Sequence, residues 1–259
     1  MICFEHINKT FNPGTVDENV LFNDFNLKVS DGEFVSIIGS NGSGKTTLLN
    51  LLCGTLTPDS GKILLGDTDL THVKEHKRAS KIGRVFQDPK AGTCSGLTIL
   101  ENMALADNKN KRYSLTPAVN KKRIDYYRTL LEECSMGLEN RLNTEVGSLS
   151  GGQRQALALV IANMSDIDLL ILDEHTAALD PKSSEIIMAL TDKLVRRHKI
   201  TSMMVTHNLR FAVEYGSRLI MMHKGGCVLD AAGEEKEELK IESILDIFNG
   251  ISIEAGNSV

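Results

Sequence analysis

One segment sets the architecture of this chain: Gly39-Ser40-Asn41-Gly42-Ser43-Gly44-Lys45-Thr46. It matches the pattern G-x-x-x-x-G-K-[ST] in full, with an apolar run before it at Phe34–Ile38 and a helical pattern after it at Thr46–Cys53. Glycines let the backbone curl tightly, so that successive amide groups point inward and form a nest for an anion. The segment therefore predicts a phosphate-binding loop between a buried strand and a helix, which Gly54 is expected to end.

The same segment supplies side chains for the phosphates and for a metal ion. Lys45 is expected to bring its positive charge to the β- and γ-phosphates, and the Thr46 hydroxyl is suited to binding Mg²⁺. The helix that begins here, with Thr47 in its first turn, adds free N–H groups. A glycine-rich turn without a ligand is the alternative, but the four fixed positions and the correct flanks disfavour it. ATP and Mg²⁺ are the expected cofactors.

The bulk composition is that of one compact globular domain with a lobe inserted into it. The chain has 259 residues, of which 41% are hydrophobic and 24% are charged, enough for a sizeable core. Its formal net charge of −5 argues against a nucleic-acid-binding domain, which usually has a basic excess. There is no apolar run near the ~20 residues of a membrane span and no signal peptide, so any membrane role is expected to come from a separate partner. The five cysteines are scattered, and neither a disulfide nor a structural zinc site is expected.

The order of apolar segments predicts an α/β fold with a mostly parallel sheet. Short apolar bursts separated by turn residues fill the first thirty positions, as is typical of antiparallel strands. From Gln153 onward helical and strand patterns alternate, which indicates a parallel sheet covered on both faces. The expected elements there are helix Gln153–Met164, strand Leu169–Leu172, helix Ser183–Arg197, strand Thr201–Val205, helix Leu209–Tyr215 and strand Arg218–Met222.

The patterns also suggest how the chain is divided. We expect a single domain over residues 1–250, with the core and an N-terminal antiparallel β part formed by residues 1–90 and 150–233. Residues 91–149 are helical in pattern and more polar, and they are expected to form an inserted helical lobe. The tail at 234–259 is expected to hold an acidic surface helix.

A second acidic site follows the run Leu169-Leu170-Ile171-Leu172. This apolar strand ends in Asp173 and Glu174, and ligands bind at the carboxyl edge of a parallel sheet. Asp173 is expected to hold Mg²⁺ through water, and Glu174 to polarise an attacking water molecule. The alternative is a strand that ends in a solvated acidic turn. The presence of a phosphate loop in the same chain disfavours that interpretation.

A third motif, Leu149-Ser150-Gly151-Gly152-Gln153, precedes a strongly helical run. Ser150 and Gln153 form a capping box, so a well-capped helix is the simple interpretation. Each glycine, however, lowers helix stability by up to ~1 kcal/mol. The glycines are reasonable if an anion must approach the backbone closely at the N-terminus of the helix.

With these three motifs in this order, the chain resembles the ABC ATPase family over about residues 1–233. The resemblance implies a P-loop NTPase fold and two ATPase copies, identical or homologous, packed head to tail. Each ATP would then be held by Lys45 of one copy and by the signature residues of the other, with Ser150 and Gly152 foremost and Gly151 and Gln153 beside them.

Four further residues match the family pattern, each with a simpler alternative. Gln87 corresponds to the glutamine that contacts Mg²⁺ and water and communicates with the membrane partner, although alone it would be a polar loop residue. Asp180 matches the loop that crosses the dimer interface, and before Pro181 it is also a good N-cap. His207 matches the histidine that contacts the γ-phosphate, although a lone histidine is usually structural. Phe11 matches the aromatic residue that stacks on adenine, with a buried core phenylalanine as the rival.

One position departs from the family. His175 stands where the family usually has proline, which removes a fixed φ angle and adds a titratable group beside Glu174. A tolerated loop substitution is the favoured interpretation. Asp-Glu-His-Thr resembles a small subgroup of bacterial importer ATPases for organic solutes such as amino acids.

The resemblance thus implies a cytoplasmic ATPase subunit on the inner face of the cell membrane. An integral membrane permease would hold it there, with an extracytoplasmic solute-binding protein in the same system and no nucleic acid. The alternative is a non-transport ABC ATPase of the translation or DNA-repair type. The former usually carry two ATPase cores, and the latter insert long coiled coils, for which 91–149 is too short. Retention of Glu174 and His207 disfavours a nucleotide sensor without hydrolysis.

Overall fold

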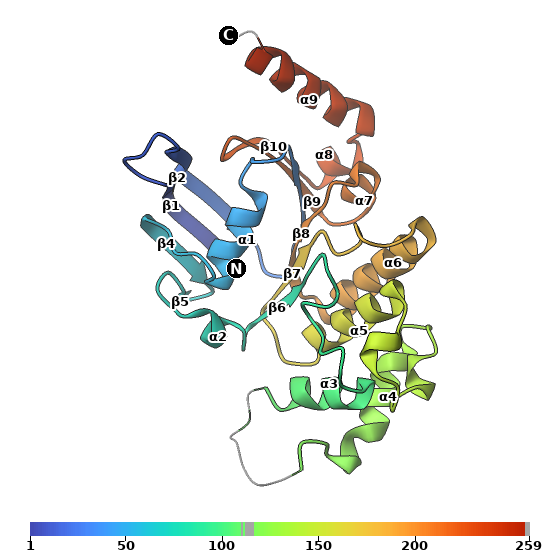
Figure 1. Cartoon of the computed structure of the whole chain (residues 1–259). Coiled ribbons are helices and arrows are strands. Elements are labelled where there is room, and N and C mark those ends of the chain that lie inside the picture. The colour runs from blue at the N-terminus through green and yellow to red at the C-terminus, as the bar shows by residue number, and fades with distance from the viewer. Residues whose placement is uncertain (110, 112–116, 257–259) are drawn as a thin grey trace.

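The computed structural model describes residues 1–109, 111 and 117–256, with side chains described through residue 251. Two sheets and the helices around them make up this part of the chain (Figure 1). The larger sheet has six strands in the order β10-β9-β3-β8-β7-β6. Its strands are β10 (Gly226–Ala232), β9 (Arg218–His223), β3 (Phe34–Gly39), β8 (Thr201–Val205), β7 (Leu169–Asp173) and β6 (Ile82–Val85).

The larger sheet is parallel apart from β10, which pairs antiparallel with β9. All six residues of β3 and all five of β8 are buried, as expected where helices cover both faces. Alternate residues serve opposite faces: Val35 and Ile37 belong to one hydrophobic cluster, whereas Phe34 belongs to another. The predicted α/β class with a mostly parallel core is confirmed.

The smaller sheet is antiparallel, in the order β2-β1-β4-β5. Two apolar bursts expected as separate strands lie in one strand, because irregular pairing between β1 and β2 absorbs the break between them. The four strands are β1 (Ile2–Phe11), β2 (Asn19–Val29), β4 (Ser60–Leu65) and β5 (Thr68–Asp69), and the short helix α2 (Glu75–Arg78) follows.

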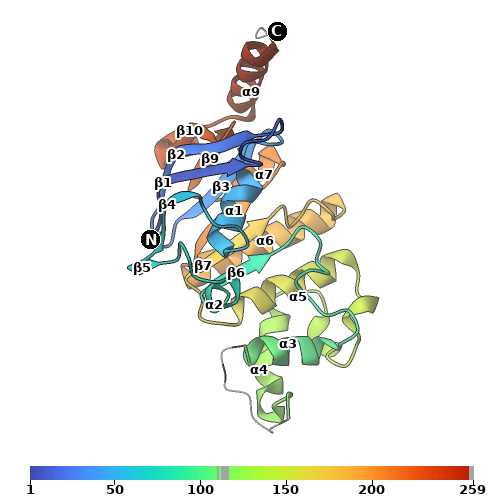
Figure 2. The same cartoon turned by 60° about the vertical axis from the view of Figure 1, so that its left-hand side comes forward.

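Helix α1 (Lys45–Cys53) lies between the two sheets (Figures 1 and 2). Leu48, Leu49 and Leu52 of this helix share one buried cluster with residues of both sheets, so α1 joins them into a single core. The helix ends where the sequence predicts, because Gly54 takes the left-handed conformation (φ 84°) and its N–H donates to the Asn50 carbonyl.

The opposite face of the larger sheet is covered by α5 (Gly151–Asn163), α6 (Pro181–His198) and α7 (Leu209–Glu214). The described residues between 91 and 149 pack against α5 at the end remote from the smaller sheet (Figures 1 and 2). The described elements of this segment are α3 (Ile99–Asp107), η1 (Lys121–Arg123), α4 (Ile124–Glu132), η2 (Leu138–Asn140) and η3 (Val146–Ser148). Buried side chains such as Met103 and Leu131 attach it to the core.

Two features of the C-terminal region differ from expectation. Strand β10 was not expected, although Gly225-Gly226 is a turn signal in the sequence. Lys224 and Gly225 both have positive φ, as the tight turn between β9 and β10 requires. The single acidic helix expected after residue 233 is wrong, because the chain forms α8 (Glu234–Glu237) and then α9 (Ile241–Gly256). Ile244 of α9 is fully buried against the body, so this helix is not purely a surface element. The last three residues of the expected tail, 257–259, lie outside the described part.

Across the described ranges, no helix is both long enough and apolar enough to cross a bilayer.

The hairpin between β9 and β10 allows a test of the packing between the sheets. A Cβ atom on Gly225 (φ 77°) would lie 1.6 Å from the Leu21 carbonyl oxygen of β2. We expect Gly225→Ala to lower the free energy of unfolding by about 2–4 kcal/mol, because both the left-handed backbone and the overlap are unfavourable. Gly14→Ala is the matched control, since its φ is 74° and a Cβ atom there would meet no other atom within 4 Å; it should lose about 1 kcal/mol. Urea unfolding measures both, and equal losses would contradict the packing argument.

Candidate nucleotide-binding site

The loop from β3 to α1 has the curled backbone that its glycines predict. Gly39, Gly42 and Gly44 have φ angles of 151°, 77° and 105°. A Cβ atom on Gly39 would lie 2.2 Å from the Met222 carbonyl oxygen, so no side chain fits there. The loop therefore depends on glycine both for its conformation and for its close approach to β9.

Lys45 points into this loop. Its Nζ donates to the carbonyl oxygens of Gly39 at 2.8 Å and Ser40 at 2.9 Å, and the residue is 5% exposed. Burial lowers the pKa of the Lys45 ammonium group, and the nearby Glu174 carboxylate opposes that effect. This buried ammonium group has only neutral acceptors among its hydrogen bonds, the two carbonyl oxygens and the Ser43 hydroxyl at 3.5 Å, and is therefore suited to an anionic ligand. The observed loop and lysine thus fit a phosphate group.

A cavity of about 260 Å³ lies at this loop. Half-buried Phe11 from the end of β1 forms part of its wall, so the structure places this ring beside the phosphate loop rather than deep in the core. The cavity also gathers residues that are far apart in sequence: Asn19, Leu21, Asn41 to Thr47, Glu174 and His207.

Glu174 and His207 follow the carboxyl ends of β7 and β8, which are neighbours in the sheet. His207 Nε2 lies 2.8 Å from Glu174 Oε1. Glu174 has φ 47°, a left-handed conformation that is uncommon for a non-glycine residue and costs it free energy. This backbone geometry aims the carboxylate toward the cavity, and nothing in the sequence indicates it.

Asp173 lies one residue earlier, at the end of β7. Its Oδ2 accepts a hydrogen bond from Arg84 of β6 at 2.7 Å, and the Asp173 side chain is 15% exposed. Thr46, in the first turn of α1, lies on the same side of the sheet as Asp173, because α1 packs on that face. One carboxylate and one hydroxyl beside a phosphate nest form the oxygen-rich set that Mg²⁺ prefers. The residues present therefore fit this metal ion.

The third motif lies at the start of α5 and does not line the cavity. Ser150 Oγ accepts from the Gln153 N–H, and the Gln153 side chain accepts from the Ser150 N–H, so the predicted capping box forms. Gly152 is buried beside Ser183 of α6, whereas Ser150 and Gly151 are exposed. Asp180 caps α6 by accepting from the Ser183 N–H at 3.0 Å. This helix tip and the start of α6 thus form one packed unit.

Gln87 is also outside the cavity. It is exposed just after β6, in a segment anchored where Gln155 of α5 donates to the Phe86 carbonyl at 3.1 Å. The structure thus brings together the phosphate loop, Phe11, Glu174 and His207. It does not bring Gln87, the third motif or Asp180 to the same cavity.

His175 does not lie beside the Glu174 carboxylate as a solvated titratable group. Its ring is buried, and Nε2 lies 3.2 Å from Thr191 Oγ1, whose hydroxyl donates to the Ile187 carbonyl. Nε2–H is therefore the donor to Thr191, which requires at least this proton on the ring. Burial lowers the pKa of His175 to about 4, so the ring is neutral near pH 7. The substitution for proline is a packing feature of the core.

Arg84 and Asn50 were not predicted from the sequence as part of this site. Arg84 interrupts an apolar strand, which was a usable signal, since a charged residue in a buried strand needs a partner. Asn50 gave no such signal in the sequence, because polar residues are common inside helices.

Comparisons with known proteins give a consistent result. A family model described as "ABC transporter" matches residues 22–177. A "Tyrosine transport ATP-binding protein" of Clostridioides difficile is 47% identical over 248 residues, covering 96% of this chain and 98% of that protein. "Energy-coupling factor transporter ATP-binding protein EcfA2" of Clostridium tetani is 32% identical, covering 88% and 78%. A solved dimeric ATP-binding cassette, MJ0796, bound to ADP and Pi, superposes with a TM-score of 0.75 at 30% identity and covers 90% and 98%.

Burial of His175 generates a prediction about pH. Its folded pKa of about 4 lies below the unfolded value of 6.5, so between these values the unfolded chain binds a proton that the folded chain does not. Stability is thus lost as pH falls from 6.5 toward 4. Between pH 7 and pH 5 the wild type should lose about 2 kcal/mol more than His175→Gln. Urea unfolding at pH 7 and at pH 5 measures this difference. His76 is exposed, so the control His76→Gln should lose as much stability between these pH values as the wild type. Identical pH dependence in His175→Gln and wild type would refute the assignment.

Proposed function

Because the chain belongs to the ABC transporter family of ATP-binding proteins, whose members hydrolyse ATP in transport systems, we propose that it powers a bacterial importer. The proposed cargo is an amino acid or a related organic solute. The relative from Clostridioides difficile, named for tyrosine transport and matched along nearly its whole length, supports an aromatic amino acid as the first candidate.

One observation carries the ATP-hydrolysing part of this proposal: the phosphate loop, Glu174 and His207 share one cavity. The loop amides and Lys45 bind the phosphates of ATP, and Phe11 stacks on adenine. Bound Mg²⁺ would offset phosphate charge, held by Thr46 and, through water, by Asp173, with Gln87 joining when its segment closes in. The other phosphate-binding positions are Gly39, Ser40, Asn41, Gly42, Ser43, Gly44 and Thr47.

Hydrolysis itself falls to the two residues at the carboxyl ends of β7 and β8. Glu174 accepts a hydrogen bond from the attacking water and polarises it toward the γ-phosphate. His207, in contact with Glu174, holds the carboxylate and contacts the γ-phosphate. Lys45 stabilises the charge that develops on the transferred group.

A second copy completes the site. The tip of α5 holds Ser150, Gly151, Gly152 and Gln153. Ser150 and Gly151 are exposed there, so this helix N-terminus is suited to an anion, but it does not line the cavity of its own chain. In a head-to-tail dimer it would meet the γ-phosphate bound by the other copy, and Asp180 would lie at the interface. Dimerisation of the cassette MJ0796 supports this arrangement.

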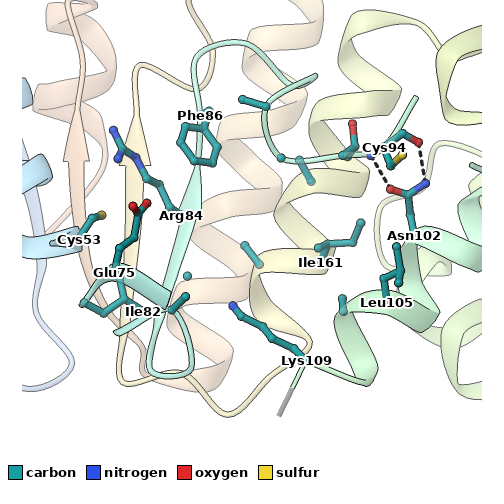
Figure 3. A pocket seen from close by; sticks show the side chains of 18 of the residues that line it. Cys53, Glu75, Ile82, Arg84, Phe86, Cys94, Asn102, Leu105, Lys109 and Ile161 are labelled. Atoms are coloured by element: carbon teal, nitrogen blue, oxygen red, sulfur yellow. Dashed lines mark hydrogen bonds between the residues drawn. The ribbon is translucent and has the colours of Figure 1, made fainter. Parts of the chain in front are cut away.

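The permease is proposed to dock in a groove of about 700 Å³ between the larger sheet and the 91–149 segment (Figure 3). Its walls include Ile82, Phe86, Leu105 and Ile161, a largely apolar set that an amphipathic segment would cover. Phe86 directly precedes Gln87, so the groove adjoins the segment that would report on the nucleotide. Through this contact the chain would lie on the cytoplasmic face of the membrane, in a system with an extracytoplasmic solute-binding protein.

The non-transport alternatives are less well supported. In the described part of 91–149, the two α-helices have nine residues each, too short for the long coiled coil of a repair ATPase.

The role of Glu174 is testable by the substitution Glu174→Gln. Turnover of Mg²⁺-ATP should fall on the order of 10²–10⁴-fold, because the amide cannot polarise water as the carboxylate does. Binding of a fluorescent ATP analogue should persist, and an ATP-dependent dimer should accumulate in size-exclusion chromatography with light scattering. Wild-type turnover in this variant would remove Glu174 from the mechanism.

The docking groove is testable with Leu105, which is 53% exposed on α3. Leu105→Asp should reduce recovery of the chain with its permease from detergent-solubilised membranes on the order of tenfold, because a carboxylate would be buried in an apolar contact. Leu245→Asp on α9, at a leucine that is 44% exposed, is the matched control and should be recovered as wild type. Equal recovery of both variants would show that the groove is not the interface, and ribosome co-sedimentation would favour a translation factor.

A further inference from the structure

Arg84 has an unusual set of contacts for a residue on a buried strand. Its guanidinium donates to Asp173 Oδ2 at 2.7 Å and to Asn50 Oδ1 at 3.1 Å, and it lies over the Phe86 ring at 4.7 Å. The Arg84 and Asp173 side chains are 16% and 15% exposed. This charge pair is therefore far less screened by water than a surface ion pair.

The position of Arg84 follows from the sheet register. Arg84 pairs with Ile171 of β7, two residues before Asp173, so both charged side chains emerge on the same face. That face is covered by α1, where Asn50 lies one turn beyond Thr46. A single guanidinium thus joins β6, β7 and α1 through its contacts with Asp173 and Asn50.

We propose that Arg84 is the resident counter-ion of Asp173 and that it limits the affinity of this site for Mg²⁺. The inference rests on the proposed function. Arg84 offsets the charge of Asp173, occupies one of its oxygens and repels any further cation nearby. Asn50 and the Phe86 ring hold the guanidinium on two other sides, so it does not simply move away when a metal arrives.

Arg84 also faces the groove proposed for the permease. It is one of the residues that line this groove, where Figure 3 also shows Glu75 and Cys53. The groove and the metal site thus share one side chain.

The test compares two dissociation constants for each purified full-length protein. Binding of mant-AMP-PNP, a fluorescent analogue that is not hydrolysed, is measured in EDTA and in saturating Mg²⁺. The dissociation constant in EDTA divided by that in Mg²⁺ reports how much bound metal strengthens nucleotide binding, and bound nucleotide strengthens metal binding by the same factor. In Arg84→Met this ratio should rise on the order of tenfold, because removal of the counter-ion makes the site more attractive to a divalent cation. Arg84→Gln, which keeps a hydrogen-bond donor without the charge, should behave in the same way if Arg84→Met does not fold.

Two controls define what the ratio means. Arg84→Lys retains the positive charge and should stay near wild type, as should Lys109→Met, which removes a different cation lining the groove. A ratio that is unchanged or lower in both neutral Arg84 variants would overturn the proposal. If Arg84 only supports the fold, its loss weakens nucleotide binding equally with and without Mg²⁺, and the ratio stays the same. If Arg84 instead orients Asp173 for the metal, its loss weakens binding only with Mg²⁺, and the ratio falls. Wild-type protein that binds the analogue no better with Mg²⁺ would instead contradict the proposed function.

Discussion

The structure depends on one constraint: between β3 and α1 the backbone must curl closely enough for several amides to face one anion. Gly39 meets the Met222 carbonyl so closely that a Cβ atom would overlap it, and Gly44 lies against the Phe22 ring of the smaller sheet. The phosphate loop is thus wedged between β9 and β2, and both sheets are needed to shape it. Helix α1 continues from the loop into the shared core, where its leucines contact residues of both sheets. The hydrophobic core therefore fixes the anion nest from two sides.

Charges around this nest are arranged in pairs that a ligand would rearrange. Lys45 is held by carbonyl oxygens, Glu174 contacts His207, and Asp173 contacts Arg84. Each pair keeps a partly buried charged or polar group compensated when no phosphate or metal is bound, which matters because an isolated buried charge is costly. The Glu174–His207 contact is the most screened of the three, because the His207 side chain is 47% exposed, whereas Lys45, Asp173 and Arg84 are mostly buried. The side chains of the site are therefore already in place for a ligand and can still exchange their partners for it.

The sequence predicted what depends on local chemistry and missed what depends on register. The phosphate loop, the Gly54 cap, the capping box of Ser150 and Gln153, and the parallel strands all follow from spacing and residue type. The Asp173–Arg84 pair does not, because it arises from how β6 and β7 align, and no residue pattern marks the positive φ of Glu174. His175 could be identified as a departure from the family, but only packing against Thr191 reveals that its ring faces the core. Strand β10 carried a turn signal in Gly225 and Gly226 that its weak apolar pattern obscured.

A short stretch of chain lies between Glu174 and the helix tip that we propose to meet a second copy. Glu174 faces the cavity, whereas Asp180, six residues later, caps α6 against the tip of α5. Between them, Leu179 touches the position of Gly151, and a second cavity of about 430 Å³ is lined by both Glu174 and Leu179. In the head-to-tail dimer that we propose, this short run of covalent and packed contacts would link the nucleotide held by one copy to the helix tip offered to the other, because Glu174 lies at one end of it and Gly151 at the other.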